Sequence, residues 1–65
     1  MFVIKAVGVE KFVHSFNRTQ QIVTFTYDVD AAKTFNVASG ADWWIRQYSD
    51  VGFGLRSSDV VVVRP

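Results

Sequence analysis

The sequence contains no cysteine and only one histidine among its 65 residues. Without cysteine, neither a disulfide bond nor a thiolate metal site can stabilise the fold. A metal site built on the single histidine would need carboxylate ligands from elsewhere in the chain. A domain of this size buries only about 60% of the surface of its unfolded chain, so its stability has to come from apolar packing.

Charge and long apolar runs are also scarce. The formal net charge is +1, which argues against a nucleic-acid binder that works through bulk charge. No apolar run approaches the roughly 18 residues of a membrane span. The N-terminal segment contains Lys5 and polar residues follow it soon after, so it does not have the pattern of a signal peptide. We expect one domain over residues 1-65, soluble and cytoplasmic, with no membrane partner.

Apolar and aromatic side chains are abundant. Hydrophobic residues make up 49% of the chain and aromatic residues 15%, with two Trp, two Tyr and six Phe. A minimal core does not need this many large rings. Either they form a dense aromatic core, or part of the apolar surface closes a homodimer or meets another protein.

Four segments have the pattern of β-strands, because β-branched and aromatic residues predominate or alternate with polar ones. In the second segment, Phe12, His14 and Phe16 are expected to share one face. The last segment offers valines to both faces, and its edge would favour aggregation if exposed. We therefore expect it inside the sheet, beside the first strand. The four segments are Phe2–Val7, Lys11–Phe16, Ile22–Tyr27 and Val60–Val63.

One amphipathic helix is expected from about residue 40 to residue 49. Ser39 is the expected N-cap, with Asp42 in the position of the capping-box acid. Four apolar residues recur at helical spacing and form the stripe that should face the core. Trp43 lies about 150° from this stripe and faces away from it. The stripe consists of Ala41, Trp44, Ile45 and Tyr48.

These elements predict an α+β fold with two layers, in which an antiparallel sheet of about four strands carries one helix packed on one face, in the order β-β-β-α-β. Asp28 or Asp30 is expected to cap a short turn before the helix, although the pair offers hard oxygen ligands that also suit a divalent cation. Residues 51–56 contain two glycines and are expected to form a loop or an irregular strand.

No set of residues meets the requirements of an enzyme site. His14 stands between two phenylalanines with no acid or nucleophile placed beside it by the sequence, so we interpret it as a structural or surface residue. We expect no catalytic residues, no metal ligands and no cofactor. A single-stranded nucleic-acid or RNA-binding domain is the alternative to a protein-binding one, because Phe12 and Phe16, with Lys11 and Arg18 nearby, could stack bases if their face were free.

The second half of the chain carries a set of short motifs that are found together elsewhere. They are Ala41-Asp42-Trp43, Gln47-Tyr48, Gly52-Phe53 and Val63-Arg64-Pro65. In this order the chain resembles very small accessory proteins of phages and mobile elements, including the inhibitors of host RNA polymerase from T7-like phages, although the spacing differs by insertions. The resemblance implies a phage or mobile-element protein that binds and inhibits a host protein.

We therefore expect a non-enzymatic protein-interaction module whose partner is a host protein, with a homodimer as a further possibility. An exposed tryptophan next to arginine is typical of an interface hot spot. The alternative is that residues 51–56 or a chain terminus cover this tryptophan. The expected partner-binding residues are Trp43, Arg46, Gln47 and Arg64.

Overall fold

Strand β1 occupies a central position in the sheet because it is apolar on both faces. Val3 and Ile4, which point to opposite faces, are both fully buried. The computed structural model describes residues 1–49 and 55–65, and in it the strand order is β3-β2-β1-β4, with all pairs antiparallel. The strands are β1 (Val3–Ala6), β2 (Phe12–Asn17), β3 (Ile22–Thr26) and β4 (Val60–Val63).

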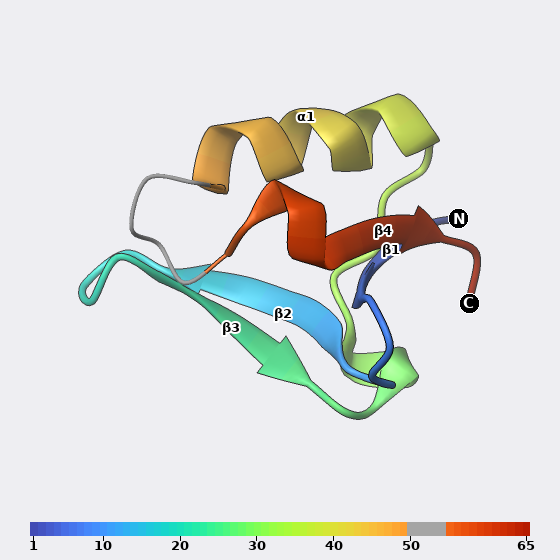
Figure 1. The fold of residues 1–65 in the computed structure, drawn as a ribbon, viewed down its shortest axis with the longest axis horizontal. Coiled ribbons are helices and arrows are strands. Elements are labelled where there is room, and N and C mark those ends of the chain that lie inside the picture. Colours follow the sequence, from blue (N-terminus) through green and yellow to red (C-terminus); the bar gives the residue numbers. More distant parts are fainter. Residues whose placement is uncertain (50–54) are drawn as a thin grey trace.

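The helix α1 (Ala38–Tyr48) lies across one face of this sheet (Figure 1). Two short 3₁₀ helices, η1 (Val29–Ala31) and η2 (Ser57–Asp59), precede α1 and β4 respectively. The predicted α+β class, the antiparallel sheet and the element order are therefore confirmed. The first two strands form a hairpin, in which Gly8 adopts the left-handed backbone conformation that favours glycine, with φ of 77°.

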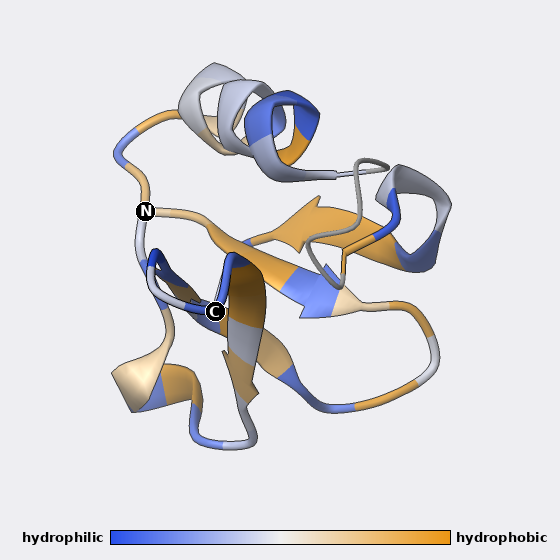
Figure 2. Ribbon diagram, turned by 90° about the vertical axis from the view of Figure 1, so that its left-hand side faces the viewer, coloured by the Kyte–Doolittle hydropathy of each residue, from blue (hydrophilic) through white to orange (hydrophobic). Residues whose placement is uncertain are grey.

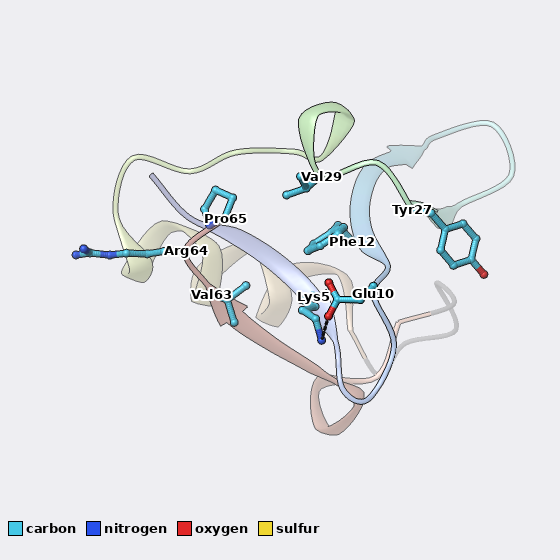
Figure 3. Close-up of a pocket in the computed structure, with 8 residues that line it drawn as sticks. All are labelled: Lys5, Glu10, Phe12, Tyr27, Val29, Val63, Arg64 and Pro65. Carbon is cyan, nitrogen blue, oxygen red and sulfur yellow. Dashed lines mark ion pairs between the residues drawn. The ribbon is translucent and has the colours of Figure 1, made fainter.

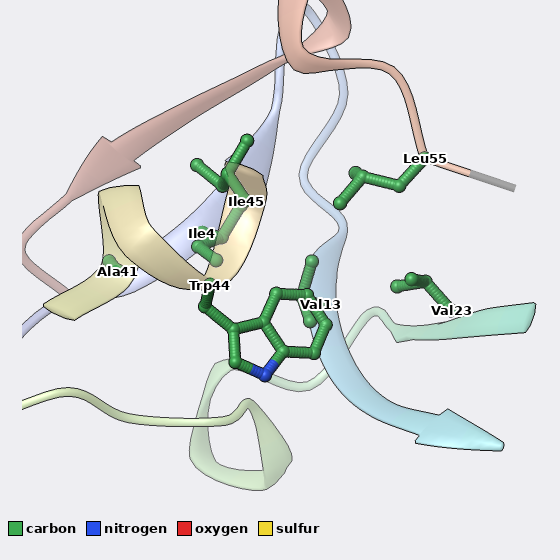
Figure 4. Packing of buried hydrophobic residues seen from close by; sticks show 7 residues of the cluster. All are labelled: Ile4, Val13, Val23, Ala41, Trp44, Ile45 and Leu55. Atoms are coloured by element: carbon green, nitrogen blue, oxygen red, sulfur yellow. The ribbon is translucent and has the colours of Figure 1, made fainter. Parts of the chain in front are cut away.

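The core between helix and sheet is built around Trp44, as the helical spacing predicts (Figure 4). Trp44 is only 7% exposed and packs with Tyr48, whose ring centre lies 4.6 Å away. The Tyr48 ring also packs on Phe16 at 4.5 Å, which joins α1 to β2. The predicted stripe is confirmed, with three residues buried and Tyr48 half-buried. The buried members of this core are Ile4, Val13, Val23, Ala41, Trp44, Ile45 and Leu55.

A second, smaller core lies on the other face of the sheet. Val3 and Phe12 pack there against Ala32, which follows η1. Asp28 caps η1 by accepting a hydrogen bond from the backbone N–H of Asp30 at 3.0 Å, so the predicted cap is confirmed. The segment around η1 therefore covers part of the face that α1 leaves free.

Residues 33–35 occupy the space where β1 and β2 separate. These strands share the register pair Lys5↔Phe12. Beyond it, the N–H of Lys33 donates to the carbonyl of Val13 at 2.9 Å, and Phe35 exchanges backbone hydrogen bonds of 2.8 and 2.9 Å with Phe2. The chain is thus fixed against both strands just before α1 begins, and Phe35 packs against the helix-side core.

The expected common face of Phe12 and Phe16 is wrong. The β2–β3 register shifts between Val13 and Ser15, so His14 is an extra residue in a β-bulge. An extra residue reverses the alternation of side chains beyond it. Phe12 therefore packs in the second core, whereas Phe16 packs with Val13 in the helix-side core.

The expected N-cap is also wrong. The helix begins at Ala38, Val37 occupies the N-cap position, and no side chain accepts a hydrogen bond there. The N–H of Gly40 donates to the carbonyl of Val37 at 3.1 Å. Because Phe35 is held by its pairing with Phe2, the first turn closes before Ser39 and places that residue inside the helix.

The position of β4 corrects a third expectation. It lies beside β1, as predicted, with register pairs from Val3↔Val63 to Ala6↔Val60, but it forms an edge of the sheet rather than its interior. The reason is topological. The hairpin places β2 on the other side of β1, and β3 follows next to β2, so β4 takes the one remaining side of β1.

Replacing Trp44 by alanine should destabilise the fold severely. The substitution removes the largest ring in the helix-side core, which is expected to cost about 3–5 kcal/mol of the free energy of unfolding. Denaturant unfolding followed by circular dichroism measures this loss. The adjacent Trp43→Ala is the control, and it should change the free energy of unfolding by no more than about 0.5 kcal/mol, because its ring is mostly exposed. Equal effects of the two substitutions would contradict the assignment of helix faces.

Candidate functional site

The outward face of α1 presents a tryptophan beside an arginine. Trp43 is 60% exposed, and Arg46 and Gln47 are exposed three and four residues later, on the same side of the helix. We call these three residues the Trp43 face. The predicted exposure of Trp43 is confirmed, and three of the four predicted partner-binding residues lie together.

Trp43 is exposed because the other side of α1 already fills the core. Ala41, Trp44 and Ile45 are buried against the sheet. Successive residues of a helix are rotated by about 100°, so Trp43 points away from this buried side. The exposure of the ring excludes the alternative in which a chain terminus covers it. The other alternative, a cover formed by residues 51–56, concerns a segment of which residues 50–54 lie outside the described residues.

Arg64, the fourth predicted residue, contacts Phe2 rather than the Trp43 face within the described part of the chain. It follows β4, and its guanidinium carbon lies 5.3 Å from the centre of the Phe2 ring, a cation–π contact with the start of the chain. It also lines a hollow on the face of the sheet that α1 leaves free. The assignment of Arg64 to the partner-binding surface stays a prediction.

This helix-free hollow, with a volume of about 440 Å³, is a feature that the sequence did not reveal (Figure 3). Its floor is apolar, and its rim carries an ion pair in which the Lys5 ammonium lies 3.5 Å from the Glu10 carboxylate. The alternating sequence pattern does not show the bulge, and therefore does not show that Phe12 and Phe16 lie on opposite faces and that Phe12 lines this hollow. Its lining residues are Lys5, Glu10, Phe12, Tyr27, Val29, Val63, Arg64 and Pro65.

The stacking platform expected for nucleic acid does not form as predicted, because Phe12 and Phe16 lie on opposite faces. Lys11 instead lies over the ring of Phe25, with its nitrogen 4.7 Å from the ring centre. A smaller cleft of about 260 Å³ does bring basic and aromatic side chains together. Its lining residues are Ser15, Phe16, Arg18, Lys33, Trp44 and Tyr48.

His14 is exposed on the bulge and contacts only hydroxyl groups in the described interactions. Its Nδ1 lies 3.3 Å from Oγ of Ser15 and 3.4 Å from Oγ1 of Thr24, while the two hydroxyl oxygens are 2.9 Å apart. No carboxylate orients the imidazole in these contacts, so they do not reproduce a nucleophile–base–acid triad. Over residues 1–49 and 55–65, no three His, Asp or Glu side chains gather closely enough to hold a metal ion.

Comparison of the chain with models of protein families, with curated proteins and with solved structures gives no match. Within the described residues, α1 is too short and too polar to cross a membrane. The Trp43 face, the helix-free hollow and the smaller cleft are the candidate binding surfaces of the described residues.

The two tryptophans should be distinguishable by fluorescence. In Trp44→Phe the remaining Trp43 should emit at long wavelength and be quenched strongly by iodide, because its ring is 60% exposed. In the matched variant Trp43→Phe, the remaining Trp44 should emit at shorter wavelength and resist quenching. Equal quenching of the two variants, both folded by circular dichroism, would show that Trp43 is covered in solution.

Proposed function

We propose that this protein is a non-enzymatic interaction module that binds a host protein through the Trp43 face. The observation that carries the proposal is a tryptophan 60% exposed on a helix whose opposite side is buried in the core. Tryptophan and arginine are the residues most enriched in interface hot spots. A residue on an anchored helix also loses little conformational entropy on binding, which favours affinity.

The composition of the Trp43 face defines the partner surface that fits it. The indole ring requires an apolar pocket, and Arg46 is best matched by a carboxylate, with which it can form two parallel hydrogen bonds. Gln47 offers both a donor and an acceptor at the rim. The complementary site is therefore an apolar groove with an acidic edge, of the kind that receives amphipathic helices.

The resemblance to small phage and mobile-element proteins supports an inhibitory role in the host cytoplasm. Of the shared motif residues, Asp42, Trp43 and Gln47 are exposed on α1, where they can contact a partner, whereas Ala41 is buried and has a structural role. A domain of this size has no evident chemistry to perform. It acts by occupying a surface that the host protein needs.

A single-stranded nucleic-acid binder is the second candidate, on the evidence of the smaller cleft. There, Arg18 and Lys33 line the cleft together with Phe16. Binding of this kind depends on phosphate charge, so its affinity falls steeply with salt, whereas docking of Trp43 into an apolar pocket depends on salt much less. Titration of mixed oligonucleotides at several salt concentrations separates the two candidates.

Trp43→Ala should weaken partner binding by about 2 kcal/mol or more while leaving the protein folded. The partner is first captured from host lysate with the unmodified protein and identified by mass spectrometry, and its affinity for each variant is then measured by calorimetry. Tyr27→Ala is the matched control, because Tyr27 is an exposed aromatic residue at the rim of the helix-free hollow, away from α1.

Unchanged affinity for Trp43→Ala, together with reduced affinity for Tyr27→Ala, would contradict the proposal and place the interface at the helix-free hollow. Loss of binding in both variants would indicate that the partner wraps around the domain rather than docking on α1.

A further inference from the structure

Within residues 1–49 and 55–65, the outer side of β4 presents backbone groups that pair with no other strand. The N–H of Val7 donates to the carbonyl of Asp59 at 2.9 Å, so residues 7 and 59 form a hydrogen-bonded pair next to the register pair Ala6↔Val60. Hydrogen-bonded and non-hydrogen-bonded pairs alternate along antiparallel strands. Val61 and Val63 therefore direct their backbone groups to β1, whereas Val60 and Val62 direct theirs outward. No strand among the described residues pairs with that side.

The two edges of the sheet are not equally protected. Natural edge strands avoid pairing through charged residues, proline or bulges. The other edge, β3, pairs with β2 at the bulge around His14, and such a bulge increases the local twist of the pair. In contrast, β4 consists of four valines, and Figure 2 shows it as hydrophobic along its length. None of the protective features occurs within β4.

We propose that this edge is a homodimer interface, in which β4 of one copy pairs antiparallel with β4 of a second copy about a two-fold axis. The charges at the two ends of β4 favour antiparallel rather than parallel pairing with a second copy. Asp59 precedes β4 and Arg64 follows it. Antiparallel pairing brings Asp59 of each copy toward Arg64 of the other, whereas parallel pairing would place like charges together.

The outward backbone groups also define the register. A hydrogen-bonded pair needs outward groups on both strands, so Val60 of one copy pairs with Val62 of the other, and Val61 lies opposite Val61 across the axis. Val61 is 43% exposed in the single chain, and its side chain lies on the face that α1 leaves free. Directly opposite residues of a non-hydrogen-bonded pair approach most closely, so this exposed valine becomes covered by its equivalent.

Four residues per strand make a small interface, so the dimer should be weak and dependent on concentration. The proposal goes beyond the function proposed above, because it uses no residue of the Trp43 face. Trp43→Ala should therefore leave self-association unchanged even where it abolishes binding of the host protein.

Amide hydrogen exchange of the unmodified protein tests the pairing directly. At low concentration the amides of Val60 and Val62 should exchange quickly, while those of Val61 and Val63 are protected by β1. Raising the protein concentration should slow exchange of Val60 and Val62 by about tenfold or more, in step with dimer formation measured by sedimentation. Dimerisation without this protection, or a protein that stays monomeric at every accessible concentration, would overturn the proposal.

Introducing a negative or a positive charge at Val61, next to the two-fold axis, tests the register. Val61→Glu and Val61→Lys should each weaken self-association by about tenfold or more, because like charges then lie directly opposite one another. An equimolar mixture of the two variants should recover a heterodimer. Val37→Glu is the matched control, since Val37 is an exposed valine before α1, and it should associate like the unmodified protein. Dimers that are insensitive to both Val61 charges, or no heterodimer from two folded variants, would overturn the register.

Discussion

The placement of residues 33–35 between the separating strands β1 and β2 is the constraint on which the rest of the structure depends. Backbone hydrogen bonds from Lys33 to Val13 and between Phe35 and Phe2 hold this segment in place. They set where α1 begins, and hence which of its residues meet the sheet. A chain without disulfide bonds thus fixes the start of α1 by backbone pairing on both sides of one gap.

Two neighbouring tryptophans acquire opposite roles because of this placement. The helical period allows only one of them to face the sheet. Trp44 packs there in a row of ring contacts that runs from Phe35 to Trp44, then to Tyr48 and Phe16. This sequence of rings connects α1 to β2 and to the segment before the helix. The more firmly Trp44 is held, the more rigidly Trp43 is presented to solvent. Stability and the candidate binding surface therefore share one origin.

The sequence predicts those features that depend on local periodicity. It does not predict features that depend on which segments, distant in the sequence, pair in the sheet. Trp44 inside and Trp43 outside follow from helical spacing alone, and β4 follows from its four valines. The bulge at His14 leaves no mark in an alternating pattern, yet it sends Phe12 and Phe16 to opposite faces and so conceals the hollow. The helix start and the edge position of β4 depend on which strands β1 pairs with, which only the assembled sheet determines.

The exposed apolar residues are informative because a domain of this size has little stability to spare. Burying a valine or larger side chain contributes roughly 1.5–3 kcal/mol, and neither Trp43 nor Val61 contributes this fully within one chain. A scattered exposed valine needs no explanation. Trp43, however, lies on a helix anchored in the core, and Val61 lies on an edge strand whose outer side pairs with no strand of the described residues. The two places lie on different elements and require different partners, one with an apolar groove and one with a matching edge. If both proposals hold, pairing through β4 would bring two Trp43 faces into one assembly instead of one.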